Sequence, residues 1–452
     1  MVNPIHYYNL SDKISSEWPT LSTHINRSGL SFSKPVLDPA YPRAVRPSTT
    51  SHRDLLPQKA KNRAGCAAVV LSDISEFYHS IYTHSIPWAL HTKQTAKTNA
   101  RAQRAARVNL LGDELDKLVR KAQDDQTMGI PIGPDTSLIL SEIVLASCDE
   151  QLLAEMPGLR GLRYFDDFEF SFPQLSEGES ALAKLQEVLL GYELRLNPRK
   201  TSLRTPPIEF EAEWVSEIRS FRFRRTASGE AGDLIGYFDL ITKHMTQLPN
   251  EHVAKYAISR LRDSKYVPFA QNVELYQSLL CQIATAEPGS IREVFESLIY
   301  VSSKGHALDI GLVSDMLTAV IVPHAPLGHT YEVAWCIWAA IGIGIVLDPV
   351  SVAAISKVEN SVVAILALDA EQQGLMLGHL DKALWEARMS EPELYDEQWL
   401  LSYEANVQGW LPSRGVADHV AADANFGFLK AAGVHFYTPA VVLGAIPAGY
   451  GP

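Results

Sequence analysis

Two patterns of hydrophobic spacing divide the chain. Up to about residue 230, short apolar runs typical of strands alternate with stretches of helical period. Residues 67–71 (AAVVL) predict a buried strand, and residues 162–165 (LRYF) and 168–172 (FEFSF) predict the two arms of a hairpin. We therefore expect an α+β domain over residues 1–230, with its first sixty residues, rich in Ser, Pro and Arg, as an irregular cap.

Beyond residue 230 the spacing is almost entirely helical. Apolar positions recur at helical period in segments of roughly 11–16 residues, separated by short Pro, Gly or Asp punctuation. Stacked helix pairs of the HEAT type fit this pattern, although no sequence repeat of fixed period is present. The stretch 224–236, in which Gly, Ser and charge cluster, is predicted to be a loop or domain boundary. The second domain, all-α, is expected over residues 231–452.

Composition indicates a globular protein outside membranes. The chain is 46% hydrophobic and 20% charged, and no N-terminal segment combines a basic start with an apolar core. The longest apolar stretch, 333–347, is shorter than the roughly 20 residues that span a bilayer, so a buried helix is expected. The four cysteines lie far apart without metal-ligand spacing, which predicts free thiols in a reducing cytoplasm.

The net charge of −12 is unevenly distributed. Residues 1–230 contain 28 Lys and Arg and 28 Asp and Glu, whereas the remaining residues contain 12 and 24. The first half therefore lacks the general repulsion toward phosphate that the total implies, and local patches decide whether it binds nucleic acid.

Three carboxylates lie where the predicted strands end. Asp73 follows the first apolar strand, and Asp166 and Asp167 lie between the arms of the hairpin. Taken alone, Asp73 is better explained as an N-cap for the next helix than as a metal ligand, and aspartates are common in turns. Together, three carboxylates on adjacent strands could hold two Mg²⁺ ions about 3.5–4 Å apart, the arrangement that serves nucleotidyl transfer.

Two further segments suit phosphate chemistry. A Gly/Pro-rich turn at 129–134 runs directly into a helix, and glycine lets a backbone approach a nucleotide closely. Lys200 could neutralise or protonate a departing pyrophosphate. In isolation, the turn reads as an ordinary loop and Lys200 as a surface charge.

The order of these segments resembles motifs A to D of reverse-transcriptase-type polymerases, in the sequences DISEFY (73–78), GIPIGPDTS (129–137), YFDD (164–167) and LNPRKT (196–201). The resemblance covers roughly residues 65–225. The sequences of residues 80–90 and 133–143 are most similar to those of the bacterial abortive-infection polymerases of the unknown group, which act against phage. In that group HEAT-like helices follow a fingers and palm domain, as expected here.

The resemblance implies roles for individual residues. Asp73 and Asp166 would bind the two Mg²⁺ ions, for which Mn²⁺ is a substitute, and Asp167 would assist at the metals or the primer end. Lys200 would face the triphosphate.

It also implies the residues that surround the nucleotide. Tyr78 matches the aromatic gate that excludes a ribose 2′-OH, so dNTPs are the expected substrates. Ile74, Gly133 and Pro134 would lie beside the incoming nucleotide.

One departure bears on template use. Templated reverse transcriptases usually carry Gln in the Gly/Pro motif, where this chain has Ile132. An aliphatic side chain cannot make the hydrogen bonds with which Gln positions a templated base pair. The abortive-infection group shares such residues, and its members resemble untemplated polymerases that prime from their own tyrosine.

The sequence does not single out the priming tyrosine. Tyr41, Tyr7 and Tyr8 are the candidates, because they lie in the N-terminal region that could reach the metals. Tyr41 is favoured because Arg43 and Arg46 follow it and could bind a triphosphate. The alternative for both arginines is a solvated loop.

A cationic stripe precedes the Gly/Pro motif. Over residues 93–107, Lys93, Lys97, Arg101 and Arg104 recur at spacings of three or four, so a helix would place them on one face. Contact with nucleic acid is favoured over a solvated surface because no acid is interleaved.

The combined prediction is a Mg²⁺-dependent, protein-primed, template-independent DNA polymerase of phage defence. Its single-stranded DNA product would be attached covalently to the protein, which would form a homo-oligomer in the bacterial cytoplasm. The alternatives are an RNA-templated reverse transcriptase and a catalytically idle nucleic-acid-binding scaffold.

Overall fold

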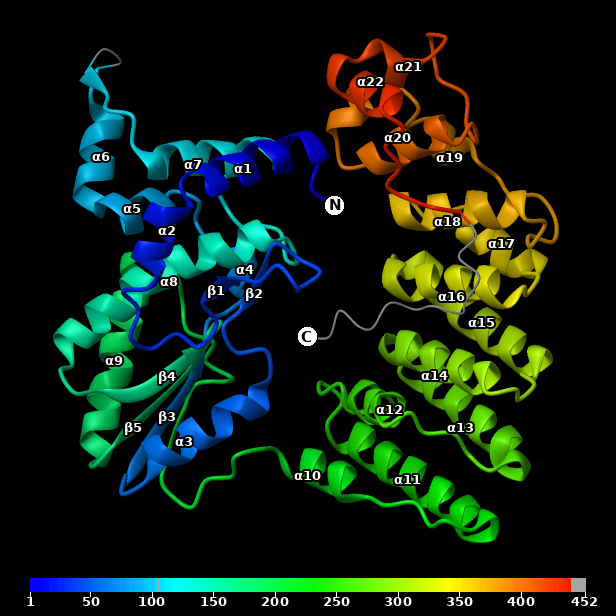
Figure 1. The fold of residues 1–452 in the computed structure, drawn as a ribbon, viewed down its shortest axis with the longest axis horizontal. Helices are drawn as coiled ribbons and strands as arrows, with labels where there is room; N and C mark the ends of the chain where they lie inside the picture. Colours follow the sequence, from blue (N-terminus) through cyan, green and yellow to red (C-terminus); the bar gives the residue numbers. More distant parts are fainter. Residues whose placement is uncertain (104–105, 440–452) are drawn as a thin grey trace. The chain divides into compact units, whose positions relative to one another are not determined.

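The computed structural model describes residues 1–103 and 106–439 (Figure 1). It divides into two compact units, one spanning Val2–Phe210 and a helical one that begins at Glu211 and includes Met1. The division falls earlier than the boundary predicted at residue 230. The predicted loop at 224–236 is wrong over most of its length, because α11 (Ala227–Gln247) begins there, with the Thr226 side chain accepting a hydrogen bond from the Gly229 amide.

The N-terminal unit contains an antiparallel sheet of order β4-β5-β3-β6. Its strands are β3 (Ala68–Asp73), β4 (Arg160–Tyr164), β5 (Asp167–Phe172) and β6 (Ser202–Arg204). The expected buried strand and hairpin are thus present. The register places Ala68 opposite Phe172 and Asp73 opposite Asp167.

The two faces of the sheet carry different side chains. Phe168, Phe170 and Phe172 of β5 are buried in the core that α8 (Asp135–Glu155) and α9 (Leu175–Gly191) share. Because successive side chains point to opposite faces, Asp167 and Glu169 lie on the other face, against which α3 (Leu56–Arg63) packs. The aspartates therefore lie at an edge of the sheet, on the face away from the phenylalanine core.

The first sixty residues are more regular than predicted. α1 (Pro4–Ser16) begins with Pro4 after Asn3, whose side chain accepts a hydrogen bond from the Ile5 amide. Leu10 and Ile14, four residues apart, are buried. The prediction of an irregular cap is wrong because this short apolar stripe is enough when α7 and α8 cover it. The remaining elements of the unit are α2 (Trp18–Ile25), β1 (Pro35–Leu37), β2 (Val45–Pro47), η1 (His52–Leu55), α3 (Leu56–Arg63), α4 (Phe77–Ser80), α5 (Ser85–His91), α6 (Lys93–Arg101) and α7 (Leu111–Lys121).

The helices of the C-terminal unit stack one after another (Figure 1), and over its described residues the only β pairing is the isolated bridge between Leu347 and Met376. Several helices pack against the next but one, as α13 does on α15 and α16 on α18. An arrangement of HEAT type stays a prediction. The helices are α10 (Glu213–Ser220), α11, α12 (Val253–Asp263), η3 (Ala270–Asn272), α13 (Val273–Ala286), η4 (Pro288–Ser290), α14 (Ile291–Ser303), α15 (Ile310–His324), η5 (Ala325–Leu327), α16 (Thr330–Ile343), α17 (Pro349–Ile355), α18 (Ser361–Gln372), α19 (Ala383–Glu386), η6 (Pro392–Tyr395), α20 (Trp399–Val407), α21 (His419–Ala422) and α22 (Ala424–Ala431).

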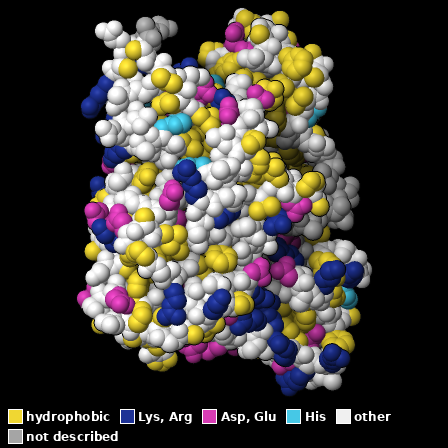
Figure 2. All heavy atoms as spheres, turned by 60° about the vertical axis from the view of Figure 1, so that its left-hand side comes forward, with side chains coloured by type: hydrophobic (Ala, Val, Ile, Leu, Met, Phe, Trp, Pro, Cys, Tyr) yellow, Lys and Arg dark blue, Asp and Glu magenta, His cyan; other side chains and the backbone are white. Residues whose placement is uncertain are grey.

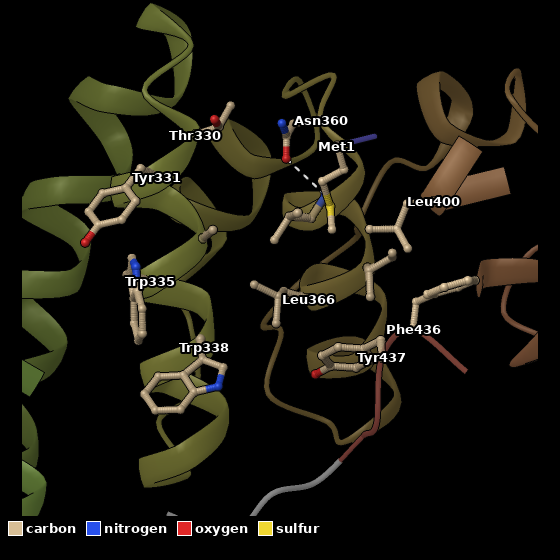
Figure 3. A pocket seen from close by; sticks show the side chains of 13 residues that line it. Met1, Thr330, Tyr331, Trp335, Trp338, Asn360, Leu366, Leu400, Phe436 and Tyr437 are labelled. Atoms are coloured by element: carbon tan, nitrogen blue, oxygen red, sulfur yellow. Dashed lines mark hydrogen bonds between the residues drawn. The ribbon is translucent and has the colours of Figure 1, made fainter. Parts of the chain in front are cut away.

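Two features of this unit are strongly apolar. By length and composition, Ile310–Leu327 is able to cross a membrane, a test that core helices of globular proteins also pass; here it packs against α13, α16 and α17. A cavity of about 530 Å³ is lined by aromatic side chains that include Trp335, Trp338 and Phe436 (Figure 3). It contains none of the predicted catalytic residues.

Candidate active site

Three aspartates meet at one edge of the sheet. Asp73 ends β3 and is only 5% exposed, Asp167 begins β5 directly opposite it, and Asp166 precedes Asp167 in the hairpin turn. Asp73 does not cap the helix that follows, since the N-cap of α4 is Glu76. The pairing of β3 with β5 therefore brings Asp73 to the hairpin aspartates, as the sequence predicted.

The loop before β6 supplies the cation of the cluster. The Lys200 Nζ lies 2.8 Å from Asp73 Oδ2, and the Asn197 side-chain amide donates to Asp73 Oδ1 at 3.3 Å. The Asn197 backbone amide also donates to the Asp73 carbonyl at 2.8 Å. The predicted motif at 196–201 thus lies directly against the first aspartate. Because the Lys200 side chain is 64% exposed, it is free to move toward a substrate.

Burial and neighbouring carboxylates raise the pKa values of Asp166 and Asp167. Burial and the negative charges of Asp167 and Asp73 raise the pKa of Asp166 to about 6. Desolvation and the charge of Asp73 also raise the pKa of Asp167. The hydrogen bond to Asp73 raises the pKa of Lys200, which keeps its ammonium protonated. One lysine therefore offsets three carboxylates that repel one another.

This donor set fits a divalent cation. Mg²⁺ prefers carboxylate oxygens and keeps several waters for substrate phosphates to replace. Within the described ranges, no three His, Cys, Asp or Glu side chains form a ready-made cage, and Lys200 is bonded to Asp73 where a cation would compete. Asp73, Asp166 and Asp167 would hold the ion, and its charge would relieve their repulsion.

A cavity of about 200 Å³ opens beside the cluster. Its lining includes Asp73, Asp167, Lys200, Lys59 and Glu169. Lys59 of α3 lies 3.2 Å from Glu169, and α3 also contributes an Arg63 guanidinium that binds the same carboxylate at 2.7 Å. Glu169 and Asp167 are the two acidic residues on this face of β5. Glu169 is thus neutralised by two cations of α3, and Asp167 is not.

Two predicted nucleotide-binding residues follow Asp73. The Ile74 side chain is 1% exposed, so only its backbone could face a nucleotide. Tyr78 on α4 is partly buried, and burial together with the charges of Glu142 and Asp166 raises the pKa of its phenol. The Tyr78 side chain is therefore near the hairpin, as a gate beside the metals requires.

The Gly/Pro turn contacts the N-terminal segment. Gly133 has φ of 110°, which favours glycine, and Pro134 is the N-cap residue of α8. Arg43 donates to the Gly133 carbonyl and lies 2.5 Å from Asp135. The Arg46 Nε instead binds the Asp38 carboxylate at 2.8 Å. Arg43 thus lies at the predicted nucleotide site, whereas Arg46 is paired elsewhere on its own hairpin.

The three tyrosine candidates have different surroundings. Tyr7 lines a cavity of about 260 Å³ together with Ala44, Asp135 and Thr136, at the start of α8. Tyr8 is 68% exposed, and Tyr41 is partly exposed with its amide bonded to the Asp38 carbonyl. Tyr7 is the candidate that shares a cavity with the Gly/Pro motif.

The predicted basic helix is shorter than expected. α6 ends at Arg101, and Arg104 lies outside the described residues. Lys93 and Lys97 lie over the Trp88 ring at 4.1 and 5.4 Å from its centroid. On the face shown in Figure 2, cationic and acidic side chains are interspersed rather than gathered in one continuous patch. Phosphate contact by this helix stays a prediction.

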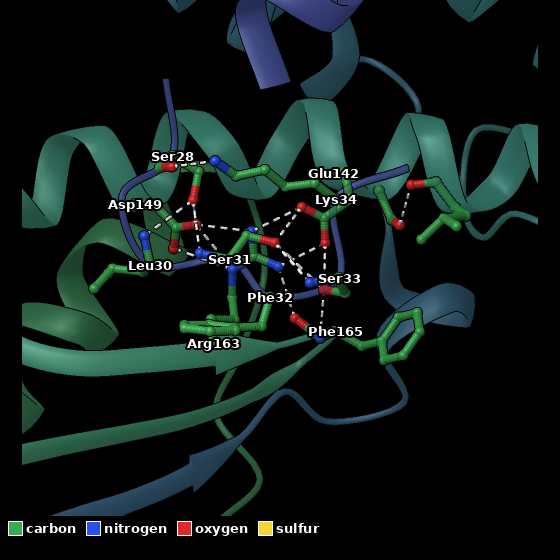
Figure 4. A network of polar contacts seen from close by, with 12 residues as sticks. Ser28, Leu30, Ser31, Phe32, Ser33, Lys34, Glu142, Asp149, Arg163 and Phe165 are labelled. Carbon is green, nitrogen blue, oxygen red and sulfur yellow. Dashed lines mark hydrogen bonds and ion pairs between the residues drawn. The ribbon is translucent and has the colours of Figure 1, made fainter. Parts of the chain in front are cut away.

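The sequence analysis missed a buried ionic network behind the hairpin (Figure 4). Arg163 is fully buried and binds Glu142 at 2.8 Å and Asp149 at 2.7 Å, both on α8. Glu142 and Asp149, seven residues apart, lie on one face of α8 among buried apolar residues, and this spacing could have indicated a buried basic partner. Ser33, which is also buried, joins the network through Glu142.

Residues 23–222 match the family described as reverse transcriptase (RNA-dependent DNA polymerase). The chain therefore contains a domain of the reverse-transcriptase type, which indicates a nucleotidyltransferase. Domains of this family use divalent metal ions, typically Mg²⁺.

No curated protein matches the chain. Solved structures similar to it include apo telomerase from Candida tropicalis, at 10% identity and a TM-score of 0.33, over 73% of this chain and 61% of that one. Telomerase from Candida albicans in complex with a TWJ fragment of telomeric RNA matches at 11% identity and a TM-score of 0.27, over 74% and 56%. The chain thus spans less than two thirds of these proteins.

Proposed function

We propose that the chain is a Mg²⁺-dependent, protein-primed, template-independent DNA polymerase of abortive-infection defence against phage. The observation that carries the proposal is the edge at which Asp73, Asp166 and Asp167 meet, with Lys200 bonded to Asp73. A scaffold would gain nothing from carboxylates that repel one another, whereas a metal-dependent transferase needs them.

The residues at this edge have different roles in nucleotidyl transfer. Bound Mg²⁺ supplies charge neutralisation of the triphosphate and activation of the attacking hydroxyl. Lys200 is protonated and exposed, so it moves from Asp73 to the triphosphate and gives its proton to the departing pyrophosphate. Tyr78 excludes the 2′-OH, which makes dNTPs the substrates.

The lack of a template rests on Ile132. This side chain is 65% exposed beside Gly133 and cannot hydrogen-bond to a template base pair. The alternative, RNA-templated synthesis, is favoured by the description of the matching family as RNA-dependent. The two candidate functions differ in whether added RNA is needed.

Protein priming makes the enzyme its own acceptor. A tyrosine hydroxyl attacks the first dNTP, and the single-stranded DNA product remains joined to the chain. Tyr7 is supported by its shared cavity with Asp135, and Tyr41 by its proximity in sequence to Arg43. We further propose that the protein is cytoplasmic and forms homo-oligomers.

The test is a labelling reaction with purified protein, Mg²⁺ and labelled dNTPs, after nuclease removal of co-purified nucleic acid. We expect label that stays with the protein on a denaturing gel, disappears with Asp166→Asn and is released by protease. Label that appears only after a primed RNA is supplied would establish the templated alternative, and silence under both conditions would favour the scaffold.

The role in defence has a separate test. Cells that carry the Asp166→Asn/Asp167→Asn variant are expected to lose protection against phage. Unchanged protection would contradict a polymerase function in defence. Mapping the labelled peptide, followed by Tyr7→Phe and Tyr41→Phe, then decides between the tyrosines.

A further inference from the structure

The residue before the catalytic turn has an unusual backbone conformation. Phe165 connects β4 to Asp166 with φ of 53°, in the left-handed region that bulky residues rarely adopt. Such a conformation persists only where its surroundings hold it. The Phe165 ring contacts the Tyr164 ring at a centroid distance of 4.7 Å, and this contact alone does not fix the backbone conformation.

Both backbone groups of Phe165 are held by buried side chains (Figure 4). The Phe165 amide donates to the Ser33 hydroxyl at 2.8 Å, and the Phe165 carbonyl accepts from the Arg163 guanidinium at 2.9 Å. Ser33 and Arg163 in turn both donate to Glu142 Oε1 at 2.8 Å. The Glu142 carboxylate on α8 therefore holds both side chains, Ser33 and Arg163, that bind the backbone of the turn.

Backbone hydrogen bonds to β4 hold the N-terminal segment that contains Ser33. The Arg163 amide donates to the Leu30 carbonyl, and the Phe32 amide donates to the Arg163 carbonyl, each at 2.8 Å. Residues 30–33 thus run along β4 and deliver Ser33 to the turn. Ser33, Glu142 and Arg163 are each at most 1% exposed, so water does not compete for these bonds.

We propose that Ser33, Arg163 and Glu142 are positioning residues that clamp the Phe165 peptide and thereby fix Asp166 for metal binding. They touch neither metal nor substrate and act through the turn. The kinetic part of this inference rests on the proposed function, whereas the clamp itself is testable without any reaction.

Ser31 provides a matched control for Ser33. Its hydroxyl also donates to Glu142, at 2.9 Å, but it makes no hydrogen bond to Phe165. Ser31→Ala and Ser33→Ala each remove one donor from the same carboxylate. Only Ser33→Ala also removes the acceptor of the Phe165 amide.

The first measurement is hydrogen exchange of the peptide that contains Phe165, in protein free of metal and nucleotide. Ser33→Ala is expected to accelerate exchange at Phe165 by about tenfold or more, the change that loss of one buried hydrogen bond produces. Ser31→Ala is expected to leave it within about twofold. Equal acceleration in both variants, or in neither, would overturn the clamp.

The second measurement separates positioning from general stability. Ser33→Ala is expected to lower kcat about tenfold with little change in the KM for dNTP, whereas Ser31→Ala lowers neither. Adding Phe165→Gly to Ser33→Ala is expected to restore most of kcat, because glycine adopts positive φ without support. If Phe165→Gly did not restore kcat, and Ser33→Ala left hydrogen exchange at Phe165 as in wild type, the positioning role would be refuted. A wild type without transferase activity would refute the proposed function instead, and hydrogen exchange would still decide the clamp.

Discussion

Two clusters of carboxylates lie three residues apart along the same hairpin, and their surroundings are opposite. Around Arg163, Glu142 and Asp149 are fully buried, and each is paired with the guanidinium. Around Asp166, the carboxylates of Asp73 and Asp167 meet at the sheet edge with Lys200 as their bonded cation.

The electrostatic consequences differ in sign between Glu142 and Asp166, whereas at Asp149, the other partner of Arg163, burial prevails and raises the pKa. Burial acts to raise the pKa of Glu142, but Arg163, with Ser31 and Ser33, outweighs it and lowers that pKa. At the edge, Lys200 and a backbone hydrogen bond act to lower the pKa of Asp166, but burial and the neighbouring carboxylates outweigh them and raise it to about 6. A balanced cluster stabilises the fold, and an unbalanced one at the surface is prepared for an external cation.

The largest expected effect comes from Asp166→Asn. Removing this proposed metal ligand should lower nucleotidyl transfer by about a thousandfold or more, since metal stabilisation of the transition state is worth several kcal/mol. The folded protein should remain intact, because a repulsive charge is lost. Labelling assays and thermal unfolding measure the two quantities, and a variant that retains near wild-type activity would remove Asp166 from the mechanism.

Arg163→Met is the converse experiment on the balanced cluster. It leaves Glu142 and Asp149 buried without their cation, which should lower the free energy of unfolding by about 3–5 kcal/mol. Denaturant unfolding measures this loss. A change below about 1 kcal/mol would mean that the network is not structural in the way its burial implies.

A smaller effect is expected for Lys200→Gln. If Lys200 is the proton donor proposed above, its loss should lower kcat about a hundredfold, within the usual range for general acids. Affinity for Mn²⁺ should not fall, because the lysine competes with the cation for Asp73. Steady-state kinetics and a metal titration separate the two expectations, and weaker metal binding would contradict the competition.

The smallest effect, and the one most specific to the comparison, is the pH dependence of stability. The pKa of Asp166 is raised in the fold, so its ionised form costs stability that builds up between about pH 4 and 6. Asp166→Asn should therefore stabilise the protein by about 1–2 kcal/mol at pH 8, and the gain should vanish near pH 4.

Glu142→Gln should show the opposite trend. The pKa of Glu142 is lowered in the fold, so its contribution is present at neutral pH and is lost as the pH falls through that value. The variant should be less stable than wild type at pH 8, and this deficit should shrink in acid. Thermal unfolding measured across pH tests both variants. If the stability of the two variants relative to wild type changed with pH in the same direction, the proposed electrostatic difference between the clusters would be contradicted.

The sequence predicted the parts of this site that local patterns carry. The strand before Asp73 follows from a short continuous apolar run, the hairpin around Asp166 and Asp167 follows from the strand-like runs on either side of it, and the structure contains both. The order of the four motifs indicated a reverse transcriptase domain, which the family match confirms.

The parts that depend on long-range packing were not predictable in the same way. Ser33 lies 109 residues from Glu142, and nothing local marks it as the acceptor of the Phe165 amide. The regular N-terminal helices were missed because α7 and α8, distant in sequence, supply the surface that stabilises them. The helix at Ala227 was missed because its N-cap outweighs the glycines that suggested a loop.

The central claim is that the three aspartates form a divalent-metal site. The most direct measurement is a Mn²⁺ titration of wild type, Asp73→Asn and Asp166→Asn, followed by electron paramagnetic resonance at pH 7.5. We predict saturable binding to wild type that each variant weakens by at least about tenfold. Binding that is absent from wild type, or equal in all three proteins, would contradict the claim.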